Sequence, residues 1–373
     1  MGTTRSEVNP DVHTEPGRFA AVYQVLQQAI DARAFPGCAF GVLAGSHVVL
    51  QDALGHFTYE GDAPAVEPHT VFDVASLTKV VSTTAAAMLL YQSGELDLDQ
   101  PLGDLLPGFV VGRDNPKFAR QVTIRHLLAH SSGLPGYVEF FRTASTPAQL
   151  FRACLELPLQ AAPGERSEYS DPGFILLGKA LEMVTHEHLC EWSHKHVFEP
   201  LSLDATGFCP RTEVRPLIPP TEFDDTLRHR AIQGEVQDEN AFVLQGAAGH
   251  AGLFSNVPDL LRFAGEILAS QDNSSGSAML FNGITVNSFA DRQGPAGSSR
   301  ALGWDTPSQD SSAGRHFSSR SIGHLGYSGC SLWVDLAAGI AVVLLTNRTW
   351  PDRENQAIKQ VRPAFHDAVR EAL

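Results

Sequence analysis

The chain has 373 residues, of which 43% are hydrophobic and 18% are charged, a composition typical of a globular protein with a large buried core. Its 42 acidic and 27 basic residues give a net charge of −15, which repels phosphate backbones, so we expect no nucleic-acid partner. The length is that of about two or three domains.

The N-terminal segment, residues 1–17, has no basic stretch followed by an apolar run, so it does not resemble a signal peptide. We expect this segment to be disordered. No run of about 18 apolar residues occurs, which argues against a membrane partner. The five cysteines are scattered without CxxC spacing, as is typical of reduced thiols, so we expect a cytoplasmic protein.

The first predicted elements are a helix and a strand hairpin. Apolar residues recur at helical spacing over 18–33, and Pro36-Gly37 ends this helix. Residues 38–45 and 47–55 have the composition of two strands around a tight turn. The chain therefore begins with a helix that precedes an antiparallel pair.

Helical patterns dominate the middle of the chain. An Ala-rich segment begins at Ser76 and ends at Gly94. Residues 271–321 are rich in Ser, Gly, Asn and Asp, and we expect long surface loops there. Further helical patterns occupy residues 124–130, 147–157, 174–184 and 189–198.

Strand patterns return near the C-terminus, where residues 329–336 and 339–347 predict a hairpin and a final helix follows from about residue 352. Because one core must bury the apolar faces of both strand pairs, we expect an α/β (α+β) fold. Its antiparallel sheet is built from both chain ends and flanked by helices. The predicted domains are a sheet domain of residues 18–75 and 240–373 and a mostly helical inserted domain of residues 76–239, with a cleft between them.

The first candidate for chemistry is Ser76, which Lys79 follows three residues later. Ser76 stands at the N-terminus of a predicted helix, where free N–H groups favour a developing negative charge. Residues three apart share a helix face, so the Lys79 amine can reach the Ser76 hydroxyl. Lys79 could take the hydroxyl proton if burial lowered its pKa by about 3 units from about 10.4. The alternative is an N-cap serine followed by a solvated lysine.

Two later segments carry further candidates. Tyr169 lies in a predicted loop, and its phenol could pass protons between Ser76 and a leaving group. The alternative is a packed tyrosine beside a helix-capping Asp171. The segment Gly323-His324-Leu325-Gly326 allows close backbone approach, and an N–H group there could complete an oxyanion hole with that of Ser76. The alternative is a strand start with an exposed histidine.

Taken in this order, the motifs Ser-x-x-Lys, Tyr-x-Asp and His-x-Gly resemble those of the β-lactamase and penicillin-binding-protein family of serine hydrolases. The segments VFDVASLTKVVST, VTIRHLLAHSSGLP, EYSDPGFILLG and GHLGYSGCSLWVDL are similar to its class C, carboxylesterase and D-peptidase branches. The resemblance implies a β-lactamase/transpeptidase-like fold and no metal or organic cofactor. It also implies catalysis by Ser76, Lys79 and Tyr169 and substrate binding by Asp171, His324, Gly326 and Tyr327, with the N–H groups of Ser76 and Tyr327 as the oxyanion hole.

Two positions depart from the family pattern. Asp171 stands where the family often has Asn, and a carboxylate near Lys79 would raise the pKa of the amine. Either Asp171 points away, or Tyr169 is the stronger candidate base. His324 replaces the Lys typical of β-lactamases and is mostly neutral at pH 7, so it holds a substrate carboxylate less strongly. Both departures argue against an efficient β-lactamase.

We therefore expect a serine hydrolase with a small ester, amide or D-peptide substrate. Carboxylesterase chemistry ranks first, because peptidoglycan lies outside the cytoplasm; D-peptide hydrolysis ranks second and β-lactam hydrolysis third. A non-catalytic ligand sensor or scaffold on the same fold is the alternative of another class. His250, in a Gly-flanked loop, is a further candidate for the site. The oligomeric state is left open by the sequence.

Overall fold

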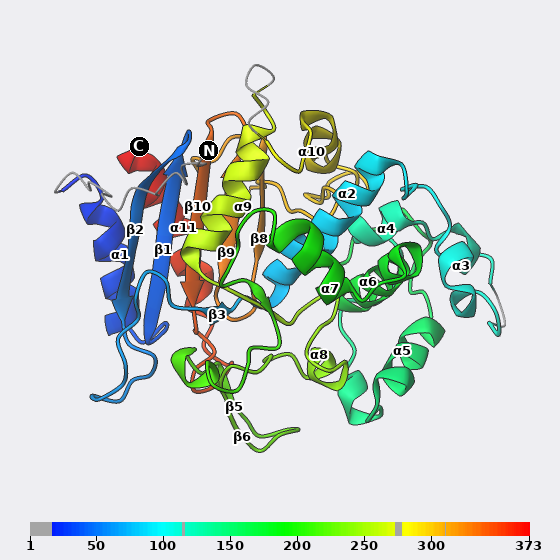
Figure 1. The fold of residues 1–373 in the computed structure, drawn as a ribbon, viewed down its shortest axis with the longest axis horizontal. Helices are drawn as coiled ribbons and strands as arrows, with labels where there is room; N and C mark the ends of the chain where they lie inside the picture. The colour runs from blue at the N-terminus through cyan, green and yellow to red at the C-terminus, as the bar shows by residue number, and fades with distance from the viewer. Residues whose placement is uncertain (1–16, 114–115, 273–277, 310) are drawn as a thin grey trace, which may run out of the picture.

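The computed structural model describes residues 17–113, 116–272, 278–309 and 311–373. Figure 1 shows a sheet with helices on both faces and a large group of helices beside it. The predicted disordered segment lies outside the described residues, apart from Gly17.

A five-stranded antiparallel sheet forms one half of the molecule, with the strand order β2-β1-β10-β9-β8. The second strand of the C-terminal hairpin, β10, pairs with β1 of the N-terminal hairpin, from Cys38 opposite Thr346 to Ala44 opposite Ile340. The predicted antiparallel sheet from both chain ends is therefore confirmed. Its strands are β1 (Gly37–Ala44), β2 (His47–Gly55), β8 (Ser321–Leu325), β9 (Ser331–Asp335) and β10 (Ile340–Thr346).

The two faces of this sheet are covered by different helices, because successive side chains of a strand point to opposite faces. Phe40 and Val42 of β1 pack in one cluster with the helices α1 (Ala20–Asp31) and α11 (Ile358–Ala372). The intervening side chains belong to a second cluster with the helix α9 (Val257–Ala269). In Figure 1, α9 lies in front of the sheet and α11 behind it.

Among the regular elements of the segment between the two sheet portions, helices predominate. Local signals set several helix ends: Gly94 adopts a left-handed conformation after α2, and Ser170 accepts a hydrogen bond from the Gly173 N–H as the cap of α6. The α-helices are α2 (Ala85–Ser93), α3 (Leu102–Leu105), α4 (Ile124–Leu128), α5 (Pro147–Glu156), α6 (Asp171–Thr185), α7 (Leu189–Ser193) and α8 (Glu239–Val243).

Shorter elements complete the helical half and link it to the sheet. Two small sheets consist of β3 (Phe72–Asp73), β7 (Leu253–Ser255) and β4 (Gly207–Phe208), and of β5 (Glu222–Asp224) with β6 (Arg230–Ile232). The remaining turns are η1 (Ala75–Leu77), η2 (Lys79–Thr84), η3 (Pro107–Phe109), η4 (Ala119–Gln121), η5 (Phe140–Arg142), η6 (His194–Phe198) and η7 (Arg215–Leu217).

The prediction of loops alone over residues 271–321 is wrong. Part of this segment forms the helix α10 (Gly283–Ala290), which packs against α2. Phe289 and Trp304 are buried, and the N–H of Gly303 donates to the Leu128 carbonyl at 2.8 Å. The segment is polar overall, but its few large apolar side chains anchor it to the helical half and bring it against the cleft.

Among the described residues, no helix combines the length and the apolar character needed to span a membrane. All five cysteines are free thiols, and Cys38, Cys154 and Cys330 are buried.

Candidate active site

Asp73 shapes the turn that presents Ser76. Its buried carboxylate accepts hydrogen bonds from the N–H groups of Ala75, at 2.8 Å, and Gln237, at 2.7 Å. Ala75 has a φ of 48°, in the left-handed region that L-residues rarely adopt. Burial raises the pKa of Asp73 to about 6. The carboxylate holds a strained turn from which the Ser76 side chain enters the cleft.

Lys79 lies directly behind Ser76 and is completely buried. Its ammonium group donates to Ser76 Oγ at 3.0 Å, to Asp171 Oδ1 at 2.7 Å and to the His250 carbonyl at 3.0 Å. All three N–H groups of the ammonium therefore have acceptors. The predicted reach from Lys79 to Ser76 is present, although the helix begins with a 3₁₀ turn and a π-helical turn rather than a regular α-helix.

The charge of Lys79 is stabilised by Asp171. Burial alone would lower the pKa of Lys79, but the carboxylate and the Tyr169 oxygen outweigh burial and raise it above its usual value. The condition for Lys79 as the base, a pKa lowered by burial, is therefore not met in this arrangement. Of the two alternatives for Asp171, the structure has the one in which its carboxylate faces Lys79.

Tyr169 stands on the other side of the Ser76 hydroxyl, with its ring centroid 4.8 Å from Lys79 Nζ. The His130 ring lies tilted against it with the ring centroids 4.6 Å apart, and His130 Nδ1 accepts a hydrogen bond from the Ser170 N–H at 3.0 Å. Burial raises the pKa of the phenol, although the charge of Lys79 pulls it down. Tyr169 is therefore a protonated phenol at neutral pH, fixed beside both Lys79 and Ser76.

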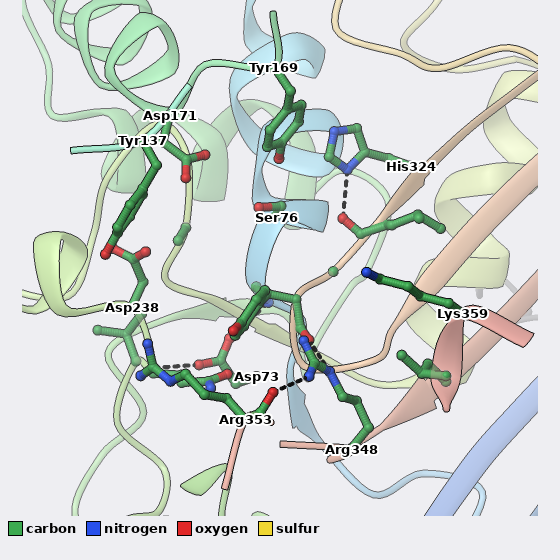
Figure 2. A pocket seen from close by; sticks show the side chains of 18 of the residues that line it. Asp73, Ser76, Tyr137, Tyr169, Asp171, Asp238, His324, Arg348, Arg353 and Lys359 are labelled. Atoms are coloured by element: carbon green, nitrogen blue, oxygen red, sulfur yellow. Dashed lines mark hydrogen bonds between the residues drawn. The ribbon is translucent and has the colours of Figure 1, made fainter. Parts of the chain in front are cut away.

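His324 lies on the edge strand β8 and faces the cleft (Figure 2). Its Nδ1–H donates to the Leu325 carbonyl at 2.9 Å, which leaves a lone pair on Nε2. That atom is buried and makes no hydrogen bond within the described chain. Burial holds the pKa of His324 well below its usual range, so the imidazole is neutral.

Gly326 and Tyr327 follow β8 and lie close to the Ser76 turn. A Cβ atom on Gly326 would be 2.4 Å from the Val74 carbonyl oxygen, so only glycine allows this approach. The Tyr327 ring is 49% exposed and lies beneath the Arg348 guanidinium at 4.4 Å. The amide N–H groups of Ser76 and Tyr327 make no hydrogen bond to any other described residue. Both donors are free to bind an oxygen atom in the cleft.

A cavity of about 610 Å³ joins these residues. Six of the eight residues that the sequence singles out line it, and the other two, Lys79 and His250, are buried and do not line it. Figure 2 shows Ser76, Tyr169 and His324 on one side of the cavity and cationic side chains on another. The lining members of the predicted set are Ser76, Tyr169, Asp171, His324, Gly326 and Tyr327.

Sequence reasoning missed several residues of this cavity. Asp238 accepts a hydrogen bond from His250 Nε2 at 2.9 Å, and His250 contributes its carbonyl rather than its ring to Lys79. Arg300 comes from the segment predicted as surface loop, and Arg348 and Lys359 come from the C-terminal segment. None of them belongs to a local motif. In the described part of the chain, no group of three His, Cys, Asp or Glu side chains is placed to hold a metal ion.

Comparisons with known proteins cover almost the whole chain. A family model described as Beta-lactamase matches residues 22–364. An N-acetylmuramyl-L-alanine amidase of Bacillus subtilis (strain 168) is 29% identical over 90% of this chain and 83% of its own length. A putative D-alanyl-D-alanine carboxypeptidase of Salmonella typhimurium is 29% identical over 87% of this chain and 81% of its own.

Solved structures agree with the fold. EstCE1, described as a hydrolase with promiscuous acyltransferase activity, superposes with a TM-score of 0.75 and 24% identity over 95% of this chain and 98% of its own. A penicillin-binding protein homologue from Caulobacter crescentus gives a TM-score of 0.74 at 19% identity over 96% of this chain and 99% of its own. At these identities the two structures support the architecture of the chain.

Proposed function

Because the chain belongs to the beta-lactamase family, a family of serine hydrolases, we propose that it hydrolyses small esters or amides through an acyl-enzyme formed on Ser76. The observation that carries this proposal is the contact of Ser76 Oγ with a buried ammonium group at 3.0 Å. A solvated lysine beside a capping serine would not be completely buried with all three N–H groups engaged.

Tyr169 is the base in this proposal. Lys79 cannot accept a proton while Asp171 holds it charged, so its ammonium orients Ser76 Oγ and balances developing negative charge. The step uses the small fraction of enzyme in which Tyr169 is a phenolate: as Ser76 Oγ forms its bond to the substrate carbonyl carbon, its proton passes to the phenolate oxygen of Tyr169. The phenol then gives a proton to the leaving-group atom as the bond to that atom breaks. Water then attacks the carbonyl carbon of the acyl group, and its proton passes to the Tyr169 oxygen. Tyr169 returns a proton to Ser76 Oγ as the bond from that oxygen to the acyl carbon breaks, which releases the acid and restores Ser76.

The oxyanion of the tetrahedral intermediate is bound by the N–H groups of Ser76 and Tyr327. Both donors lie at the cleft and have no other acceptor in the described chain. The loss of one such donor typically lowers the rate by about 10²–10³. The tight contact of Gly326 with Val74 keeps the two donors at a fixed separation.

Esters rank first among the substrates. A base that is mostly protonated at neutral pH suits a reactive carbonyl, and the alkoxide of an ester leaves more readily than the nitrogen anion of an amide. D-peptide hydrolysis ranks second and is favoured by Arg348 and Lys359, cations of the cleft that could hold a terminal carboxylate. The amidase and carboxypeptidase names of the two relatives support the same second candidate. β-Lactam hydrolysis ranks third, because Asp171 replaces an amide side chain that the resemblance associates with β-lactam binding.

A panel of p-nitrophenyl acetate and butyrate, a D-alanyl-D-alanine peptide and nitrocefin, at equal enzyme concentration, tests this proposal. We expect the highest kcat/KM for an ester. The Ser76→Ala variant should lose turnover of every member of the panel while its free energy of unfolding stays within about 1 kcal/mol of the parent. Unchanged ester hydrolysis by Ser76→Ala would refute the role of Ser76.

A further inference from the structure

Arg300 contacts the ring of the proposed base. Its guanidinium carbon lies 5.1 Å from the centroid of the Tyr169 ring. The backbone around Arg300 is fixed: its N–H donates to Ser298 Oγ at 3.1 Å, and its carbonyl accepts from the Gln293 N–H at 3.0 Å. A β-bridge to Asp305 closes the loop. The contact with Tyr169 is thus made from an ordered loop.

The charge of Arg300 is not balanced by a carboxylate. Within the described ranges of the chain, its guanidinium has no ion-pair or hydrogen-bond partner. Asp305, in the same loop, accepts instead from Ser299 Oγ at 2.6 Å and from the Thr306 N–H at 3.0 Å. Arg300 is half-buried and lines the cleft. Water therefore screens the electric field of its guanidinium less than it would screen that of a fully exposed charge.

The other ionisable groups around Tyr169 supply no net positive charge. Lys79 of η2 is charged, but the carboxylate of Asp171, at the start of α6, neutralises it. His130, which follows α4, and His324 of β8 are both neutral, because burial holds their pKa values well below the usual range. The charges of Arg300 and Lys79 lower these two pKa values further. Arg300 is therefore the uncompensated cation of the group.

We propose that Arg300 is a positioning residue whose guanidinium stabilises the phenolate of Tyr169 and so supplies the positive charge that His324 does not carry. This inference rests on the proposed function, in which Tyr169 takes the proton of Ser76. Arg300 acts on the proton acceptor through the ring and needs no contact with the reacting atoms.

The physical consequence is a change in the amount of active base. Only the phenolate can accept the Ser76 proton, so the acylation rate rises with pH until the phenol is fully ionised. Removal of a neighbouring cation raises the pKa of a phenol. The acidic limb of the pH–rate profile then moves to higher pH, and one pH unit of movement corresponds to a tenfold loss at any pH on that limb.

The rate of labelling by a fluorophosphonate, measured from pH 6 to pH 11, tests this inference without a known substrate. In this step Ser76 Oγ bonds to phosphorus, fluoride leaves, and the hydroxyl proton passes to Tyr169. We expect Arg300→Met to label about tenfold more slowly at pH 7, with its acidic limb shifted up by about one unit. Arg300→Lys keeps the charge and should recover most of the parent profile.

The matched control is Arg320→Met, which removes the same charge from a side chain that contacts Asn287 and Asp291 and does not line the cleft. Its profile should be that of the parent. If Arg300→Met does not fold, Arg300→Gln takes its place. A neutral variant that labels with the parent profile, or an Arg300→Lys variant that is slowed as much as Arg300→Met, overturns the inference. A parent enzyme that is not labelled at Ser76 instead overturns the proposed function.

Discussion

Two cationic regions border the same cleft and differ in how their charge is balanced. Behind Ser76, the buried ammonium of Lys79 is paired with Asp171 and fully hydrogen-bonded. Across the cavity, Arg348 donates to the carbonyls of Tyr327, Arg353 and Asn355 and has no carboxylate partner in the described chain. Lys359 is exposed and has no ion-pair partner there either.

This difference in charge balance suits the two regions to different roles, the positioning of Ser76 Oγ and the attraction of an anionic substrate. A neutralised ion pair cannot attract a substrate anion, but it holds the reactive oxygen in one place. Unbalanced cations at the far side of the cleft do little for the serine, but they create a positive field that an anionic group can enter. Substitutions in the first region should therefore reduce the chemical step, and those in the second should change substrate preference.

Replacement of Lys79 should have the largest effect. Lys79→Met removes the group that orients Ser76, and we expect kcat/KM to fall by about a thousandfold. It also leaves the Asp171 carboxylate without its counter-ion, so the free energy of unfolding should fall by about 3 kcal/mol. Steady-state kinetics and urea denaturation measure the two effects.

The double variant Lys79→Met, Asp171→Leu separates stability from catalysis. An apolar pair of similar volume should recover most of the lost stability, because no buried charge is left unpaired, while activity stays low. Recovery of activity together with stability would mean that Lys79 is only a structural element.

Substitution of Gly326 should have an intermediate effect. In Gly326→Ala the new methyl group meets the Val74 carbonyl oxygen, so the end of β8 has to move away from the Ser76 turn. A displacement of about 1 Å in an oxyanion hole can cost about 10²-fold in rate, so kcat should fall with little change in KM. Gly61→Ala, where the Cβ has open space around it, is the control and should leave both constants unchanged. Equal activities of the two variants would contradict the proposed geometry.

Substitution of Lys359 should have the smallest effect, and only on charged substrates. An exposed charge contributes at most about 1 kcal/mol, so Lys359→Met should raise KM for a D-alanyl peptide by up to about fivefold. The KM for p-nitrophenyl acetate should not change. Lys195→Met, which removes an exposed lysine paired with Glu187, is the control. An equal change for both substrates would show that the second region does not select charge.

Much of the fold could be predicted from local patterns. The β1–β2 and β9–β10 hairpins have apolar strands joined by short turns, and their sharing of one sheet follows from the need to bury both. Residues 271–321 could not be interpreted in this way. Phe289 and Trp304 are too far apart to give a period, and their burial depends on α2 and on the contact of Gly303 with α4.

In the candidate site, too, local contacts could be predicted from the sequence and long-range contacts could not. The spacing of Ser76 and Lys79 predicts their contact, because a single helical turn determines it. Lys79 and Asp171 are 92 residues apart in the sequence, so their contact could not be predicted. The sequence showed only that such a contact, if formed, would raise the pKa of Lys79. Arg300 comes close to Tyr169 only in the folded chain, so no sequence motif predicts this contact.

Covalent acylation of Ser76 is the step on which all the other proposed roles depend. Rapid acid quenching of p-nitrophenyl acetate turnover, followed by peptide mass spectrometry, tests it most directly. We expect one acetyl group on the peptide that contains Ser76, formed and lost at rates compatible with turnover, and no acetyl group in Ser76→Ala. Turnover without a covalent acetyl group, or with the acetyl group on another residue, would contradict it.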